Sequence, residues 1–287
     1  MSAVSQVSPL RKRMIEDMQL HGLSKITQES YVRAVRQLSQ YVQRGPDKIS
    51  EEDIRRYFLY LANEKKVRRS TATVALCGIK FFYENTLRRD WPTLRLVRPA
   101  YERKLPVVLS RDEVRRVLAE VQLAVYRVCL TTIYSCGLRL TEGARLQVAD
   151  IDSERMLLRI HGKGKRERYV ALPEPTLNKL RALWKTHRSP KWLFPSWCSK
   201  RAAPITGRSL QRAFGDALQR SGITKKAHVH TLRHAYATHL MEVGVNLRLI
   251  QETLGHRHPR TTAIYTHLTQ PVWDTMTGPL HELVKDL

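Results

Sequence analysis

One stretch of the sequence, residues 228–267, dictates a succession of short helices separated by turns. Apolar side chains recur there at spacings of three and four residues: Leu232, Tyr236, Leu240 and Val243. Residues three or four apart share one face of a helix, so the spacing predicts a helix with one buried side. Gly244 suits the left-handed position that ends a helix, and Asn246 suits the N-cap of the next one.

The same stretch gathers the side chains that attack on a phosphodiester requires. His230 and Arg233 are three residues apart and are expected to point together into a cleft. A second short helix is expected to end at Gly255, directly before His256, and a third to carry Tyr265. An imidazole, a guanidinium and a phenol supply a proton acceptor, a phosphate ligand and a nucleophile.

The charge of the chain points to a polyanionic partner. The net charge is +24 at pH 7, and it is not confined to a tail. Residues 1–100 hold 19 Lys and Arg against 10 Asp and Glu, and the rest of the chain holds 31 against 16. Nucleic acid is the favoured partner. An anionic membrane is the weaker alternative, because no basic amphipathic helix stands out.

Cysteine usage and hydropathy bear on location. The four cysteines are widely spaced and form no C-x-x-C pair, which indicates reduced thiols in a cytoplasmic protein. No leader-like segment begins the sequence, and no apolar run approaches about 18 residues. We therefore expect neither export nor a membrane partner.

The first part of the chain reads as a small helical bundle. Residues 10–87 carry helical apolar spacing, with Thr27 expected as one N-cap and Ser50 with Asp53 as a capping box. Basic residues expected to contact DNA phosphates cluster within it: Lys65, Lys66, Arg68 and Arg69. The alternative for this cluster is a solvated charged face.

A proline-bearing segment, residues 91–106, is expected to link two domains. Beyond it, Ser110 and Glu113 predict another capping box. Alternation at 156–160 and 169–172, around the turn "HGKGKRER", predicts a β-hairpin that holds lysine at its tip. The fold class is therefore mainly α, with a helical bundle followed by a mainly helical domain that holds a small antiparallel β-sheet.

Five motifs, in this order and spacing, resemble the tyrosine recombinase (phage-integrase-type) family, most of all its two-domain Xer-type members. They are "SCGLRLTE" at 135–142, "GKGKRER" at 162–168, "HTLRH" at 230–234, "LGH" at 254–256 and "TTAIYTH" at 261–267. The resemblance implies a SAM-like, DNA-binding core-binding domain over residues 1–98. It implies a catalytic domain over 99–287 with a tail at 270–287. One departure is Gly143, where the family commonly has a bulky apolar residue.

The resemblance also implies a role for each matching residue. The implied catalytic set is Arg139, Lys163, His230, Arg233, His256 and Tyr265. In it the arginines clamp phosphate and Tyr265 is the nucleophile. Glu142 supports the first arginine, and Lys165 could share or replace the role of Lys163.

The implied activity is site-specific cleavage and rejoining of duplex DNA through a 3′-phosphotyrosyl intermediate, for integration or excision of a mobile element. No metal, ATP or other cofactor is expected. The expected assembly is a homotetramer on two DNA sites, held together through the tail at 279–287. A type IB topoisomerase is one alternative, and a non-catalytic DNA-binding regulator is another. The complete catalytic set argues against the regulator. The histidines of residues 228–267 also allow a zinc alternative, which lacks an H-E-x-x-H motif.

Overall fold

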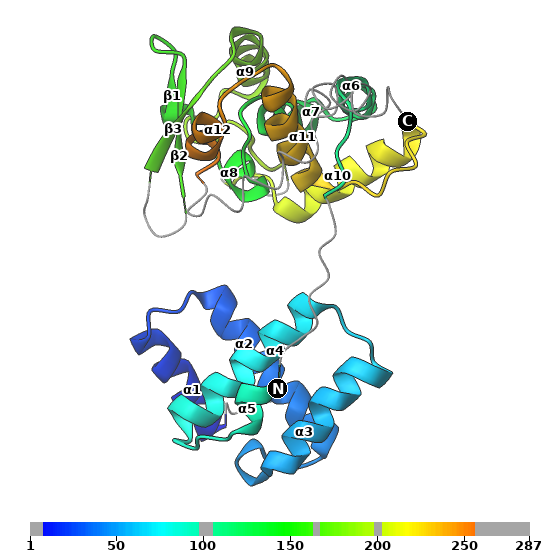
Figure 1. Ribbon diagram of the computed structural model, residues 1–287. Helices are drawn as coiled ribbons and strands as arrows, with labels where there is room; N and C mark the ends of the chain where they lie inside the picture. Colours follow the sequence, from blue (N-terminus) through cyan, green and yellow to red (C-terminus); the bar gives the residue numbers. More distant parts are fainter. Residues whose placement is uncertain (1–7, 98–105, 163–166, 198–202, 256–287) are drawn as a thin grey trace, which may run out of the picture. The chain divides into compact units, whose positions relative to one another are not determined.

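The computed structural model describes residues 8–97, 106–162, 167–197 and 203–255. The chain divides into two compact units, Met1–Lys104 and Leu105–Leu287, which are drawn in Figure 1. Each unit has its own cluster of buried apolar side chains.

Unit 1 is a bundle of four main helices, as the apolar spacing predicts. Its elements are α1 (Pro9–Leu20), α2 (Lys25–Val42), η1 (Pro46–Lys48), α3 (Glu51–Leu59), η2 (Tyr60–Glu64), α4 (Arg69–Phe81), η3 (Phe82–Thr86) and α5 (Thr93–Leu96). The segments η2 and η3 are π-helical turns that extend α3 and α4, and the sequence did not indicate them. The bundle core includes four fully buried side chains, Met18, Leu38, Ile54 and Ile79.

One of the two N-caps expected in unit 1 is confirmed and the other is wrong. Ser50 caps α3 reciprocally with Asp53, with backbone N–H bonds of 3.2 Å and 3.0 Å. In α2 the N-cap is Ser24, whose hydroxyl accepts from the backbone N–H of Thr27 at 3.4 Å. Thr27 therefore lies inside the first turn, since two hydroxyl residues three apart offered alternative caps and the helix begins at the earlier one.

Unit 2 is mainly helical around one small sheet. Its elements are α6 (Arg111–Ala119), α7 (Ala124–Ser135), α8 (Leu140–Ala144), η4 (Val148–Asp150), β1 (Ile151–Asp152), β2 (Leu157–His161), β3 (Glu167–Ala171), α9 (Glu174–His187), α10 (Gly207–Arg220), α11 (Val229–Glu242) and α12 (Leu247–Leu254). The expected capping box of Ser110 and Glu113 begins α6. The mainly α fold class with a small antiparallel sheet is confirmed.

The sheet has the strand order β1-β2-β3, and both pairs are antiparallel. Leu158 pairs with Val170 on the buried face, and His161 pairs with Glu167 at the end where the hairpin turns. The two-residue strand β1 was not expected, because two residues carry no detectable alternation. In Figure 1 α12 lies beside this sheet, and α12 contacts β3.

The central helix α11 corrects one expectation about burial. Leu232 is fully buried, but Val243 is 59% exposed. The buried set includes Thr231, Arg233 and Ala235, which do not form one stripe. The reason is that α11 contacts α6, α7, α10 and α12, so different neighbours cover different sides of it.

Gly143 of α8 has a packing explanation. A Cβ atom added there would lie 2.4 Å from Cγ1 of Ile133 on α7, and Ile133 is fully buried. Ile133 therefore occupies the space that a bulky side chain at position 143 would need. Packing in the core of unit 2 therefore explains why position 143 departs from the family pattern.

Candidate active site

The turn between α7 and α8 positions Arg139. Gly137 has a φ of +61°, which ends α7, and Arg139 is the N-cap of α8. Glu142 accepts both the backbone N–H of Arg139 and its Nη1, each at 2.8 Å. Nη2 of Arg139 also donates to the carbonyl of Gly255 at 3.3 Å. Arg139 is thus fixed at its backbone and at its guanidinium, although its side chain is 39% exposed.

Glu142 is the centre of a group of three arginines from three elements. Besides Arg139, Arg168 of β3 donates from Nη1 to Oε1 at 3.0 Å and from Nη2 to Oε2 at 2.8 Å. Nη1 of Arg233 on α11 lies 3.8 Å from Oε2. Burial alone would raise the pKa of Glu142, but the hydrogen bonds from Arg168 and Arg139 outweigh burial and lower the pKa to about 2. The carboxylate is therefore charged at neutral pH.

Arg233 is buried and joins two distant turns. Its Nη1 donates to the carbonyl of Gly137 at 2.7 Å, and its Nη2 donates to the carbonyl of Leu254 at 2.6 Å. A Cβ atom at Gly137 would lie 2.5 Å from the ring of Tyr236, so that turn requires glycine both for its φ and for its space. Arg233 therefore ties the start of α8 to the end of α12.

His230 lies in the first turn of α11 and is exposed, unlike Arg233. Its pKa is lowered by desolvation, then by the neighbouring His228, and then by the positive charges of Arg233 and Arg139. The two arginines therefore lie close enough to His230 to act on its charge. The imidazole is neutral at neutral pH, which is the state that accepts a proton.

Four of the expected site residues lie outside the described residues: Lys163, Lys165, His256 and Tyr265. The strands on either side of 163–166 are described, and so is Gly255, which ends α12 with a φ of +63°. Of the remaining expected residues, the structure brings together Arg139, Glu142, His230 and Arg233.

Sequence reasoning missed Arg168. Its place in "HGKGKRER" predicts a turn residue, but Arg168 lies in β3, where it pairs with Ile160 of β2, and its Nε donates to the carbonyl of Thr253 on α12 at 2.9 Å. Its side chain is only 15% exposed. A signal was present in the alternation, because Arg168 is two residues before the buried Val170 and so falls on the inward face of the strand. A charged residue on that face needs a buried partner, which is Glu142.

The basic residues expected to bind DNA lie together in unit 1. Lys65, Lys66, Arg68 and Arg69 are exposed and occupy the turn between η2 and the start of α4. Lys66 has a φ of +45°, in the left-handed region. Their exposure leaves them accessible to a phosphate backbone.

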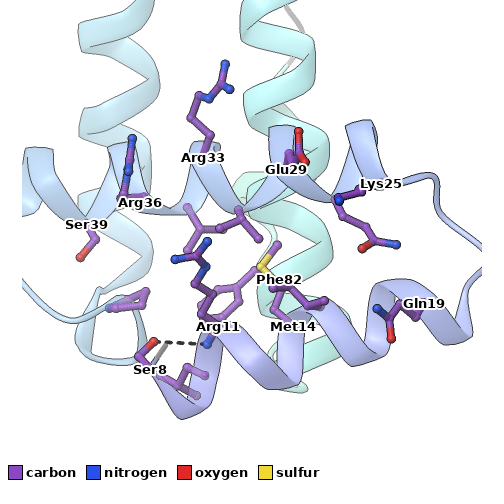
Figure 2. Close-up of a pocket in the computed structure, with 16 residues that line it drawn as sticks. Ser8, Arg11, Met14, Gln19, Lys25, Glu29, Arg33, Arg36, Ser39 and Phe82 are labelled. Atoms are coloured by element: carbon purple, nitrogen blue, oxygen red, sulfur yellow. Dashed lines mark hydrogen bonds between the residues drawn. The ribbon is translucent and has the colours of Figure 1, made fainter. Parts of the chain in front are cut away.

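Unit 1 also has a groove of about 1040 Å³ along α1 and α2. Figure 2 shows Met14 and Phe82 within it. The charged side chains that line it are Arg11, Lys25, Arg33, Arg36 and Glu29. Four cations against one carboxylate add to the basic character of unit 1, and the groove holds none of the residues of the Glu142 group.

No cluster of three or more His, Cys, Asp or Glu side chains in the described ranges could hold a metal ion. No helix within those same ranges is both long enough and apolar enough to cross a membrane.

Family models match both units. The Phage integrase family matches residues 107–271, and the family described as "Phage integrase, N-terminal SAM-like domain" matches residues 10–93. Together these ranges contain every motif of the expected active site.

Individual proteins agree with the family models. The chain is 42% identical to the putative integrase/recombinase y4qK of Sinorhizobium fredii, over 91% of this chain and 85% of that protein. It is 34% identical to the tyrosine recombinase XerD of Oceanobacillus iheyensis, over 87% and 90%. The fold is similar to the crystal structure of the XerH site-specific recombinase bound to its palindromic difH substrate in a post-cleavage complex. That likeness has a TM-score of 0.73 at 18% identity and covers 95% of this chain and 85% of the other. The chain belongs to the phage integrase family of tyrosine recombinases, enzymes that cleave and rejoin DNA.

Proposed function

We propose that this protein is a site-specific recombinase that cleaves and rejoins duplex DNA through a 3′-phosphotyrosyl intermediate on Tyr265. The observation that carries the proposal is the group around Glu142. It gathers Arg139, Arg168 and Arg233 beside the carbonyls of Leu254 and Gly255, the residues that directly precede His256.

In the proposed mechanism the arginines stabilise charge on the phosphate. Attack on a phosphodiester builds negative charge on the non-bridging oxygens, and a guanidinium held in place in advance stabilises that charge without rearrangement. Arg139 is the more accessible of the two proposed ligands, with its side chain 39% exposed against 5% for Arg233. Glu142 holds the guanidinium of Arg139 at 2.8 Å, and the carbonyls of Gly137 and Leu254 hold that of Arg233.

The proposed proton transfers balance across the two steps. Oη of Tyr265 attacks phosphorus and gives its proton to His230, while the 5′-oxygen leaves with a proton from Lys163 or Lys165. His256 completes the set as a second active-site histidine. In the reverse step a 5′-hydroxyl attacks the phosphotyrosine and releases the phenol. Phosphodiester energy is kept in the covalent bond, so neither ATP nor a metal ion is needed.

The two units have different proposed tasks. Residues 1–98 form the core-binding domain, in which the cluster at 65–69 contacts phosphates, and residues 99–287 form the catalytic domain. One nucleophile cleaves one strand, so exchange between two duplexes calls for four protomers. We expect a tetramer on two DNA sites, joined through residues 279–287, in a cytoplasmic protein that integrates or excises mobile DNA.

The test is to trap the covalent complex on a nicked suicide substrate in excess EDTA and to sequence the attached DNA. A single preferred site with a 3′ linkage to Tyr265 is the expected result. Relaxation of supercoiled DNA at many sites would indicate a topoisomerase instead. Binding without any adduct would indicate a regulator, and loss of the adduct in EDTA would restore the metal alternative.

A further inference from the structure

The guanidinium of Arg168 donates to the protein from each of its three nitrogens. Nη1 and Nη2 donate to Oε1 and Oε2 of Glu142 at 3.0 Å and 2.8 Å, and Nε donates to the carbonyl of Thr253 at 2.9 Å. The side chain of Arg168 is 15% exposed, against 39% for that of Arg139. Arg168 is therefore directed at its protein neighbours, whereas Arg139 is the more accessible guanidinium.

Arg168 contacts both of the acceptors that hold the guanidinium of Arg139. These acceptors are Oε1 of Glu142, 2.8 Å from Nη1 of Arg139, and the carbonyl of Gly255, 3.3 Å from Nη2. Nη1 of Arg168 donates to the same Oε1. A Cβ atom added at Gly255 would lie 3.1 Å from Cδ of Arg168, so the stem of Arg168 passes beside that residue. A change at position 168 therefore reaches Arg139 through two contacts at once.

The carboxylate of Glu142 is saturated by donors. It accepts four hydrogen bonds, from the backbone N–H and Nη1 of Arg139 and from Nη1 and Nη2 of Arg168. The two oxygens of a carboxylate offer about four lone pairs, so these bonds occupy all of them. Oε2 of Glu142 also lies 3.8 Å from Nη1 of Arg233, and three guanidinium charges against one carboxylate leave a net charge of +2. The parallel fork of Arg168 balances the single negative charge, and the excess stays on Arg139 and Arg233.

We propose that Arg168 is a positioning residue: it neutralises Glu142, so that the other two arginines of the group keep their positive charge for the scissile phosphate. The inference rests on the proposed function, in which Arg139 and Arg233 stabilise that phosphate. Without Arg168 the net charge of the group falls from +2 to +1, because two guanidinium groups then face one carboxylate. A fixed charge in a site shielded from water acts more strongly than one in solution, so this loss weakens stabilisation of the transition state.

Two substrates separate a role in charge from a role in folding. One is the natural DNA, and the other carries a methylphosphonate at the scissile position, where a methyl group replaces one non-bridging oxygen. The methylphosphonate is neutral, so attack on it builds less negative charge and depends less on the arginines. In single-turnover cleavage of the natural DNA, Arg168→Gln should be slower than the wild type by about tenfold, less than the roughly 10²–10³-fold typical of losing a direct donor. On the methylphosphonate it should match the wild type, with DNA affinity unchanged in gel shifts.

A matched control and a charge-restoring variant sharpen the comparison. Arg115→Gln is the control, because Arg115 pairs with Asp112 at 3.0 Å but both side chains are 78% exposed. It should cleave both substrates at the wild-type rate. The double variant Arg168→Gln/Glu142→Gln removes the carboxylate together with its partner, so the two remaining arginines again give a net charge of +2. It should therefore cleave the natural DNA faster than Arg168→Gln does.

Urea unfolding shows whether each variant is folded. If Arg168→Gln is not folded, Arg168→Lys takes its place in the comparison, since a lysine keeps one charge but cannot fork onto both oxygens of Glu142. The defect of Arg168→Lys should be smaller than tenfold and still confined to the natural DNA. An equal defect of Arg168→Lys on both substrates would contradict the proposal.

Arg139→Ala separates this inference from the proposed function. If Arg139→Ala is impaired equally on both substrates, stabilisation of the phosphate by arginine is itself wrong, and the proposed function fails. If the methylphosphonate relieves Arg139→Ala while Arg168→Gln is impaired equally on both substrates, only the positioning role is overturned. Full activity of Arg168→Gln on the natural DNA, or a double variant no faster than Arg168→Gln, would overturn that role as well.

Discussion

Arg168 and Glu142 form two parallel hydrogen bonds, 3.0 Å from Nη1 to Oε1 and 2.8 Å from Nη2 to Oε2, across 26 residues of sequence. The paired geometry matches the planar fork of a guanidinium to the two oxygens of a carboxylate. These bonds join the strand β3 to α8, whose N-cap is Arg139. The proposed phosphate ligand Arg139 is therefore supported, through Glu142, by the strand β3, although Arg139 lies outside that strand.

Glu142→Gln tests this support. The amide keeps the shape but removes the charge that faces the guanidinium groups of Arg168 and Arg233. Breaking a buried ion pair in this way costs on the order of 3–5 kcal/mol. We expect urea unfolding of unit 2 at a clearly lower midpoint. Glu154→Gln, at an exposed position, is the control and should change stability by less than about 0.5 kcal/mol. Equal midpoints for the two variants would contradict the central place of Glu142.

Tyr265→Phe tests the nucleophile. The change removes one oxygen and little volume, so the protein should keep its DNA affinity in gel shifts and lose the covalent adduct on suicide substrates. Tyr236→Phe is the matched control, because it makes the same change at a tyrosine outside the proposed catalytic set. Tyr236 is partly buried, and burial raises its pKa to about 12. An adduct at the wild-type level in the Tyr265 variant would exclude it as the nucleophile.

Gly143→Leu tests the packing of α7 on α8. Its side chain would enter the space of Ile133, and overpacking of this kind costs roughly 1–3 kcal/mol. Ile133→Ala alone leaves a cavity and costs about 2–5 kcal/mol. The double variant should be more stable than the sum of the two losses predicts, because one change makes room for the other. Strict additivity in thermal unfolding would mean that the two side chains do not compete.

Stability should fall on mild acidification because of His234. Burial, followed by the charges of His228, His230 and Arg233, lowers its pKa from 6.5 to about 4. The unfolded chain binds the proton more tightly, so stability is full above pH 6.5 and is lost as the pH falls towards about 4. For a partly exposed ring the loss is at most about 2 kcal/mol. In His234→Gln the urea midpoint should depend less on pH between about 4 and 6.5. An unchanged dependence of the midpoint on pH would show that His234 does not cause the loss of stability.

DNA affinity should depend steeply on salt through the cluster at 65–69. Each phosphate contact adds about 0.9 to the slope of log affinity against log salt. The triple change of Lys65, Lys66 and Arg68 to Gln should make the slope shallower by roughly 2–3. Lys12→Gln is the control, because Lys12 already faces Glu16 at 3.9 Å. A slope that the triple change leaves untouched would place these cations away from the DNA.

Local sequence signals were enough for several helix ends. The boxes at Ser50 and Ser110, the cap at Asn246, the left-handed Gly244 and the helix end at Gly255 are all confirmed. Each of these signals depends on residues within about four positions of one another, so the local sequence is sufficient to predict it.

Contacts between distant segments could not be predicted in the same way. Arg233 meets the carbonyl of Gly137 across 96 residues, and its burial depends on the carbonyls that the fold presents. Helical spacing alone predicted that His230 and Arg233 lie together, whereas Arg139 joined their site only through the resemblance to a family. Neither the spacing nor the charge pattern could identify Glu142 as the point where three arginines meet, because that meeting depends on the packing of β3, α8 and α11.

The buried clusters of the two units share no residue, and each contains its own aromatic and aliphatic centre, such as Tyr83 in unit 1 and Phe214 in unit 2. A substitution that disturbs one centre leaves the other packed. A gene can therefore acquire a different first unit by recombination while the packing around Glu142 in unit 2 stays the same. If the first unit contacts DNA as proposed, the choice of DNA site and the chemistry of cleavage can diverge at separate rates.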